Sequence, residues 1–402
     1  MSHSHVLEKP KKKRPVVVQK YGGSSLATPE QVQKIARKIV ERKEQGIDLV
    51  VVVSAMGKTT DEFIKLAHQV NPHPTPRELD MLISVGERIS ISMVTLAINA
   101  TGKFQAISFT GSQIGLVTDT NHTNARIVEI KGHRLREALA EDKIVVIAGF
   151  QGVSTTKEIT TLGRGGSDTT AVALAAALEA DSCEILSDVD GIYTADPRFI
   201  NEAQRLDVVD YDLALEMSAA GARMLHKAAV EFAQKHNISL SLGLSATGEV
   251  GTIVTRQNMS DLSPTGVVVD SDLVVFRMSD AGGAVPNLLP RLSAERFDVK
   301  LWQYLAGTAL LACSGAEACR IEALCRKMDV KFSIERDKAL LSLIGTGVGV
   351  GTPAAGRFFK VLAKFAISLS AVLSGELFLK VLVERDAADT ARKIVHDEFF
   401  NP

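Results

Sequence analysis

Apolar runs rich in β-branched residues constrain the fold of this chain more than any other sequence feature. Three clear runs occupy residues 16–18, 49–53 and 144–147, and each leads into glycine or hydroxyl residues. Continuous apolar runs of this kind are typical of parallel strands that are buried on both faces. Helical patterns lie between the runs, so we predict a doubly wound, mostly parallel α/β sheet up to about residue 245. Ligands of such sheets bind at the carboxyl ends of the strands.

The composition indicates a protein of two or three domains with a large core. The chain has 402 residues, of which 46% are hydrophobic, and no uninterrupted apolar run of bilayer-spanning length. Its formal net charge is −1, which provides no basic field to attract nucleic acid. We therefore expect a soluble cytoplasmic protein that binds neither nucleic acid nor a membrane.

The cysteines and the first residues carry no site in our interpretation. The four cysteines show no Cys-x-x-Cys spacing, which argues against a zinc site or a disulfide framework and favours reduced thiols. Residues 1–15 contain a short basic block from Lys9 to Arg14 and lack the apolar core of a signal peptide. We interpret these residues as a disordered leader.

Residues 160–170 form the strongest candidate for a ligand-binding turn. Three glycines in this stretch let the backbone approach a ligand, and the Ser-Asp-Thr-Thr cluster at 167–170 is expected to cap the alanine-rich helix that follows. Free N–H groups at a helix N-terminus bind anions. Arg164 suits a carboxylate or phosphate, and Asp168 adds the opposite charge. The pair predicts a site for an amino-acid zwitterion, and an ordinary glycine-rich turn is the alternative.

Two strand exits carry further candidate residues. Lys20 stands at the end of the first run, directly before Tyr21 and a double glycine, where its ammonium could reach phosphates. The second run leads through Ser54 to the sequence Gly-Lys-Thr-Thr at 57–60. This is not a P-loop, because such a loop requires a glycine where Val52 stands.

Two other segments leave alternatives open. Glu87 lies in a predicted helix and is either a solvated side chain or a second acid in a substrate pocket. Residues 183–198 run from a short strand into an acidic turn, an aromatic and an arginine. This order suits a nucleotide-binding face, and a tight surface hairpin is the alternative.

Five motifs, taken in order and spacing, closely resemble the aspartate kinases of the amino-acid kinase superfamily. They occupy residues 20–25, 53–56, 84–87, 161–178 and 187–198, and the resemblance extends over residues 16 to about 256. It implies that ATP is bound by Lys20, Tyr21, Gly22, Gly23, Ser187, Asp188, Tyr193, Thr194, Ala195, Asp196, Pro197, Arg198 and Arg223. It implies that aspartate is bound by Ser54, Lys58, Thr59, Thr60, Glu87, Arg164, Gly165, Gly166, Ser167 and Asp168. The expected catalytic residues are Lys20, Arg164 and Asp168.

At one position the chain departs from the family pattern. The family usually has lysine in the helix motif Gly-Ala-Lys-Val-Leu-His, and this chain has Arg223 there. Arginine keeps the positive charge but presents it as a planar fork. The departure therefore bears on nucleotide affinity and not on the type of reaction.

The reaction that the resemblance implies transfers the γ-phosphate of ATP to the β-carboxylate of L-aspartate, which gives 4-phospho-L-aspartate. This product begins the synthesis of lysine, threonine and methionine. A carboxylate with a pKa of about 3.9 is ionised at pH 7 and attacks without a general base. The site must instead cancel repulsion between two anions. Lys20, the N-terminus of the predicted helix after Asp168 and Mg²⁺ held mainly by the ATP phosphates could do so. The alternatives are a kinase of another small acid, such as glutamate or N-acetylglutamate, and a non-catalytic amino-acid sensor.

The pattern changes after residue 256. Residues 257–265 are polar and predict a linker after a catalytic domain at 16–256. Residues 266–335 and 336–402 each suggest a βαββ unit, and the two resemble the paired ACT domains of aspartate kinases. The short strand at 267–269 could pair with the second unit instead of the first. The resemblance also implies a homodimer or higher homo-oligomer formed through these domains.

The expected effector loops of the ACT-like units lack family features. In feedback-controlled members, the effector lies at a loop reading Asp-x-Pro-Gly and near a Gln-Asn pair. Here residues 279–283 have no proline, and residues 302–304 read Trp-Gln-Tyr, with an aromatic in place of the asparagine. In the second unit Thr352-Pro353 stands where the family has Pro-Gly, and the proline removes a backbone donor that could face an effector carboxylate. A pocket built from other side chains is the alternative.

We predict that lysine and threonine inhibit the expected kinase activity weakly or not at all. Effector control requires a differential binding free energy of about 1–3 kcal/mol between states, and loss of polar groups from a small pocket could remove most of it. The measurement is a dose response of aspartyl-phosphate formation to lysine, threonine and both together at subsaturating aspartate. Strong inhibition by either amino acid would contradict the prediction.

Overall fold

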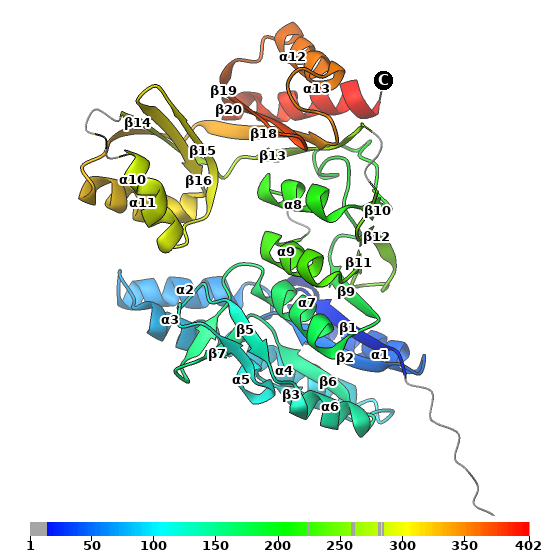
Figure 1. Cartoon of the computed structure of the whole chain (residues 1–402). Helices are drawn as coiled ribbons and strands as arrows, with labels where there is room; N and C mark the ends of the chain where they lie inside the picture. The colour runs from blue at the N-terminus through cyan, green and yellow to red at the C-terminus, as the bar shows by residue number, and fades with distance from the viewer. Residues whose placement is uncertain (1–13, 223–224, 259–261, 280–282, 284, 402) are drawn as a thin grey trace, which may run out of the picture. The chain divides into compact units, whose positions relative to one another are not determined.

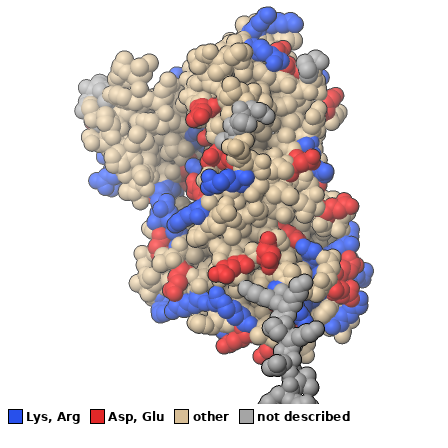
Figure 2. Space-filling model, turned by 45° about the vertical axis from the view of Figure 1, so that its right-hand side comes forward, with Lys and Arg blue, Asp and Glu red and all other residues tan. Residues whose placement is uncertain are grey.

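The computed structural model describes residues 14–222, 225–258, 262–279, 283 and 285–401. Residues 1–13 of the predicted leader, Arg223 and most of the 279–283 loop lie outside the described residues. The chain forms two compact units, which are Met1–Asp190 with Ile238–Glu249, and Gly191–Asn237 with Val250–Pro402. Acidic and basic side chains are interspersed over the face of the molecule in Figure 2, in keeping with the net charge of −1.

The first unit is built on a parallel sheet, as the sequence predicts. Its strands lie in the order β11-β9-β1-β2-β6-β3 (Figure 1). Every neighbouring pair in this order is parallel. The strands are β1 (Val16–Tyr21), β2 (Asp48–Val53), β3 (Ala106–Phe109), β6 (Ile144–Ala148), β9 (Ser182–Ser187) and β11 (Leu240–Leu244).

Helices cover the two faces of this sheet. One core joins α1 (Pro29–Lys43) and α4 (Val85–Asn99) to Val17 and Tyr21 of β1 and to alternate residues of β2 and β6. Side chains alternate along a strand, so Val18 and Lys20 point to the opposite face. There α7 (Gly166–Leu178) packs against β1 and β2. The alternation of side chains along β1 therefore places Lys20 on the face of the sheet that α7 covers.

The start of α1 agrees with the sequence pattern. The cap residue Thr28 forms a capping box, in which its hydroxyl accepts from the Gln31 N–H and the Gln31 side chain accepts from the Thr28 N–H. Pro29 occupies the first helical position, where its missing N–H costs no hydrogen bond.

A smaller sheet in the same unit leads into the glycine-rich turn. Its strands lie in the order β5-β4-β7-β8. They are β4 (Leu116–Thr118), β5 (Ile127–Ile130), β7 (Gln151–Ser154) and β8 (Ile159–Thr161). The remaining elements of the unit are η1 (Gly23–Leu26), α2 (Thr59–Val70), α3 (Pro76–Ile83), α5 (Gly111–Ile114) and α6 (His133–Ala140).

One helical stretch of this unit is long and apolar enough to cross a membrane by length and composition. It covers Pro76–Asn99 and contains an 18-residue window with a mean hydropathy of 1.6. The stretch consists of α3 and α4, which meet at Ser84. Ile91, Val94 and Ile98 of α4 lie in the core against β2 and β6. These contacts are those of a core helix.

The second unit contains two four-stranded antiparallel sheets. The first has the order β15-β16-β14-β17, and α10 (Val285–Ala294) and α11 (Gly315–Lys327) pack on one of its faces. The second has the order β13-β18-β20-β19, and it packs against α12 (Pro353–Lys364) and α13 (Ala388–Phe400). The strands are β13 (Pro264–Asp270), β14 (Val274–Ser279), β15 (Val299–Leu305), β16 (Thr308–Cys313), β17 (Lys331–Glu335), β18 (Lys338–Gly345), β19 (Leu369–Ser374) and β20 (Phe378–Glu384).

These sheets confirm the predicted α+β class of the C-terminal part and add elements that the sequence pattern did not reveal. These additional elements are α11, β17 and β19. β13 pairs antiparallel with β18, with Val267 opposite Leu343. The sequence left open whether the strand at 267–269 pairs with residues 266–335 or with residues 336–402, and it pairs with the latter. The unit also contains α8 (Tyr211–Ala219), α9 (Lys227–His236), η2 (Arg385–Ala387), β10 (Val208–Val209) and β12 (Val250–Val254).

Candidate active site

Strand register gathers the predicted motifs of the first unit at one edge of the sheet. Tyr21 pairs with Val53 and with Leu186, and Val53 also pairs with Ala148. The segments that follow β1, β2, β6 and β9 therefore leave the sheet side by side. Motifs that are up to about 170 residues apart in the sequence come together because the strands are parallel.

Backbone contacts join these exits closely. The Gly22 N–H donates to the Leu186 carbonyl at 3.2 Å, and the Gly57 N–H donates to the Gly23 carbonyl at 2.9 Å. A Cβ atom on Gly23 would lie 2.4 Å from the Ala55 carbonyl oxygen. Only glycine fits at this position, so the double glycine after Lys20 and Tyr21 permits the turns after β1 and β2 to touch.

Lys20 and Asp168 form an ion pair at this edge. The Lys20 Nζ lies 2.6 Å from Asp168 Oδ1, and both side chains are only 11% exposed. The oxygen lacks the alignment of a hydrogen bond. Burial of two charges in contact costs less than burial of either one alone, so the pair holds the end of β1 against the start of α7.

The glycine-rich turn begins α7 differently from the predicted way. The cap residue is Gly165, with φ of 69°, and no side chain caps the helix. The expectation that residues 167–170 cap it is therefore wrong, because the left-handed conformation of Gly165 starts the helix at Gly166. Ser167 and Asp168 lie inside the first turn, where a carboxylate interacts favourably with the helix dipole.

The predicted charge pair of the zwitterion site is divided in the structure. Asp168 contacts Lys20, whereas Arg164 is exposed and makes no ion pair within the described part of the chain. Gly163, with φ of 74°, and Gly165 flank the arginine. Two glycines in the left-handed region present Arg164 outward on a turn that other residues would strain.

Glu87 is a buried acid, and the alternative of a solvated side chain is wrong. It is 3% exposed, and its Oε1 accepts from the Ala55 N–H at 3.1 Å. Oε2 is buried and has no hydrogen-bond partner among the described residues. Burial raises the pKa of Glu87 from 4.5 to about 7, against the opposing effect of the hydrogen bonds from the backbone. The carboxyl group thus has one oxygen available to a cationic or N–H donor.

Gly86 brings Glu87 to this position. A Cβ atom on Gly86 would lie 2.7 Å from the Cβ of Ala55, so the glycine lets α4 approach the end of β2. The predicted aspartate-binding hydroxyls lie in the same turn. Thr59 donates to the Met56 carbonyl at 2.6 Å, Ser54 and Thr60 are half-buried, and Lys58 is the exposed cap residue of α2.

Asp80 is a buried residue that the sequence analysis did not assign to the site. Its carboxylate is fully buried and accepts from the Thr161 hydroxyl at 2.6 Å and from the Thr123 N–H at 3.0 Å. His122 Nδ1 lies 2.7 Å from the same group. These contacts hold the strand directly before the glycine-rich turn. An acid at an interior position of an apolar helix was the only sequence signal.

The predicted nucleotide-binding residues belong to both units. Ser187 and Asp188 follow β9 in the first unit, where Ser187 Oγ lies 3.1 Å from the backbone N of Val189. The Tyr21 side chain is buried in the core, so only its backbone can contact a ligand. Arg223 lies outside the described residues.

Residues 193–198 form an ordered turn within the second unit. Thr194 and Ala195 are buried, whereas Pro197 and Arg198 are exposed. Arg198 and Asp196 pair at 2.6 Å, and this contact lowers the pKa of the Asp196 carboxyl. The Thr194 N–H donates to the Gln204 carbonyl at 2.9 Å. Residues 193–198 therefore have the shape of a tight surface hairpin, which was the alternative to a nucleotide-binding face. The exposed polar groups of this turn remain available to a ligand.

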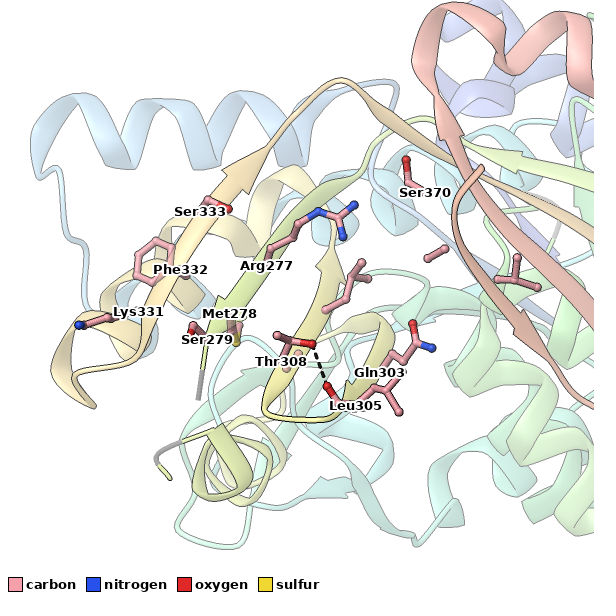
Figure 3. Close-up of a pocket in the computed structure, with 14 residues that line it drawn as sticks. Arg277, Met278, Ser279, Gln303, Leu305, Thr308, Lys331, Phe332, Ser333 and Ser370 are labelled. Atoms are coloured by element: carbon pink, nitrogen blue, oxygen red, sulfur yellow. Dashed lines mark hydrogen bonds between the residues drawn. The ribbon is translucent and has the colours of Figure 1, made fainter. Parts of the chain in front are cut away.

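A groove of about 700 Å³ in the second unit contains none of these residues (Figure 3). Its lining comes from β14–β17 and β19 and includes Gln303 of the 302–304 segment. Arg277, which lines it, pairs with Glu335. Among the described residues, its lining includes Arg277 and Lys331 but no histidine, cysteine or acid, and it contains none of the predicted site residues, so we do not assign the chemistry to it.

Comparison with known proteins identifies similar chains. Residues 15–243 match the amino acid kinase family. The chain is 41% identical to an aspartokinase of Mycolicibacterium smegmatis and 40% identical to one of Corynebacterium glutamicum, in each case over 96% of both chains.

Solved structures show the same fold. A crystal structure of E. coli aspartokinase III with aspartate and ADP superposes with a TM-score of 0.84 at 22% identity, over 96% of this chain and 100% of that one. The aspartate kinase of Synechocystis superposes with a TM-score of 0.56 at 34% identity, over 96% of this chain and 69% of that one.

We predict that Glu87→Gln changes the pH dependence of stability. Because the folded protein binds the Glu87 proton more tightly than the unfolded chain, the wild type loses stability as pH rises from about 4.5 to about 7. The amide cannot ionise, so the variant should gain about 3 kcal/mol relative to the wild type by pH 8. Urea unfolding at pH 5 and pH 8 measures this difference, with Glu62→Gln on exposed α2 as the control. An equal change in both variants would contradict the burial of an ionisable Glu87.

Proposed function

The chain belongs to the amino acid kinase family and, within it, to the aspartokinases, and from this premise we propose which residues carry the reaction. The protein is an aspartate kinase, which transfers the γ-phosphate of ATP to the β-carboxylate of L-aspartate. The similarity to aspartokinases over 96% of the chain removes support from the kinase of another acid and from the non-catalytic sensor.

We assign the phosphates of ATP to Lys20 and to the turn at Gly22 and Gly23. The observation that carries this proposal is the Lys20–Asp168 contact at the carboxyl edge of the sheet. A buried ammonium at a strand end, next to backbone that must be glycine, suits a polyanion. Because a phosphate oxygen offers the same charge-assisted contact as a carboxylate oxygen, Lys20 can exchange Asp168 for a phosphate.

Aspartate is assigned to the turns on either side of this pair. Arg164 is exposed and without an ion pair in the described chain, so it can hold the α-carboxylate. Asp168 holds the α-amino group, and the free oxygen of Glu87 adds a second acceptor close to Ala55. Ser54, Thr59 and Thr60 complete the polar wall.

These residues fit Mg-ATP without an acid–base pair for proton transfer. The β-carboxylate of aspartate is already ionised at pH 7, so the protein's task is orientation and cancellation of charge. Mg²⁺ bound to the phosphates would supply further positive charge next to the phosphoryl oxygens. Lys20 and the N-terminus of α7 would act on the same oxygens from the protein side.

The organisation around this site is also proposed. We assign residues 16–256 to the catalytic domain and residues 266–335 and 336–402 to two ACT-like domains with exchanged strands, which join two copies of the chain in the cytoplasm. These bounds differ from the two compact units, because residues 191–237 pack with the C-terminal part.

Lys20→Ala should lower the rate of aspartyl-phosphate formation by about 10²–10³, since loss of one electrostatic stabiliser of a transition state typically has this effect. A hydroxamate assay with aspartate, glutamate and N-acetylglutamate measures the rate and the choice of acid. Lys34→Ala, at an exposed position of α1, is the control. Turnover of the Lys20 variant within a few-fold of wild type would remove Lys20 from the mechanism.

Arg164→Ala and Asp168→Ala should mainly raise the KM for aspartate. Asp168→Ala also leaves Lys20 buried without its partner, at a cost of about 2–5 kcal/mol, so its kcat should fall as well. Arg164 makes no ion pair in the described chain, so Arg164→Ala should change the KM for ATP little. Calorimetry with each ligand separates the two effects. Normal aspartate binding and lost ATP binding in both variants would show that this turn serves the nucleotide instead.

A further inference from the structure

The C-terminal helix of the second unit contacts the segment assigned to the nucleotide. His396 of α13 is fully buried, and its Nε2 lies 2.9 Å from the Thr194 hydroxyl oxygen. Arg392, which is 5% exposed, places its guanidinium carbon 4.0 Å from the centre of the Phe199 ring. The two side chains are four residues apart, so they share one face of the helix. One helical face therefore reaches both ends of residues 194–199.

Thr194 is held at several atoms in addition to the histidine contact. Its carbonyl accepts from the Val267 N–H at 2.7 Å, and its hydroxyl accepts from the Gln204 N–H at 3.0 Å. A Cβ atom on Gly266 would lie 3.1 Å from the Thr194 carbonyl oxygen. β13 and Gln204 thus fix the backbone of Thr194, and Gln204 and His396 together fix its hydroxyl.

The burial of His396 calls for an explanation beyond packing. Its Nδ1 is buried without a hydrogen-bond partner among the described residues, and its ring stacks on Phe400 with centroids 5.0 Å apart. Burial lowers the pKa of His396, so the ring is neutral near pH 7. An apolar residue at position 396 would avoid the unpaired nitrogen. Within the described structure, the contact with Thr194 is the only one that requires a polar ring at this position.

We propose that His396 and Arg392 are positioning residues for ATP, which hold residues 194–199 in the shape that binds the nucleotide. This inference rests on the proposed assignment of residues 193–198 to the nucleotide. The helix that carries both residues packs on the sheet of β13, β18, β20 and β19 through Ala391, Ile394 and Val395. A change in that ACT-like sheet would therefore reach the nucleotide segment through α13.

The test is a kinetic comparison of full-length variants. His396→Leu should raise the KM for ATP about three- to tenfold, which corresponds to loss of one hydrogen bond. Thr194→Val also loses the contact with the Gln204 N–H and should raise this KM at least as much. Both variants should change the KM for aspartate less than about twofold. The double variant should be no worse than the poorer single one, because both remove the same contact. His396→Gln, which retains a polar group, should recover most of the ATP affinity. His236→Leu, at an exposed position that also stacks on a phenylalanine, is the control.

Two results would overturn the proposal. One is a KM for ATP in His396→Leu that equals the wild-type value, and the other is an equal loss for ATP and aspartate, which a general loss of structure would produce. If His396→Leu does not fold, Thr194→Val carries the same comparison. Arg198→Ala distinguishes the failures, since a raised KM for ATP in that variant alone keeps the nucleotide assignment and removes only the role of α13. If neither His396→Leu nor Arg198→Ala changes the KM for ATP, both the nucleotide assignment of residues 193–198 and the role of α13 are wrong.

Discussion

The contact between Lys20 and Asp168 is the interaction on which the candidate site depends. It requires β1 to end beside the start of α7, and it requires Lys20 to point to the α7 face of the sheet. The alternation of side chains along β1 meets the second condition, because Val17 and Tyr21 occupy the opposite face against α1 and α4. The glycines at 22–23 and 163–166 then let the neighbouring turns approach without steric conflict. A lysine buried alone would be costly, and this pairing makes its position tolerable.

The parallel sheet and its strand exits could be predicted from the sequence because they depend on local patterns. β-branched runs indicate buried strands, and a capping box at Thr28 fixes the start of α1 by short-range contacts alone. Lys20 and Glu87 were candidates for the same reason, since each follows or precedes a recognisable glycine motif. The start of α7 was predicted wrongly, because a left-handed glycine caps that helix and no side chain does.

Residues that act through tertiary contacts could not be found in this way. Asp80 holds Thr161 from 81 positions away, and His396 meets Thr194 across 202 positions. Neither distance leaves a local sequence pattern. The pairing of β13 with β18 is similar, because both candidate partners of this short strand have the same apolar character and only the packed sheet decides between them. The contact of His396 with Thr194 also links residues 193–198 to the C-terminal sheet on which α13 packs.

The most direct test of the account is a crystal structure with a non-hydrolysable ATP analogue, Mg²⁺ and aspartate. We predict that Lys20 Nζ moves from Asp168 to within about 3 Å of a phosphate oxygen, which is the distance of a charge-assisted hydrogen bond. In the same complex, Arg164 should contact the α-carboxylate of aspartate. A Lys20 that still contacts Asp168 while the phosphates bind elsewhere would contradict the account.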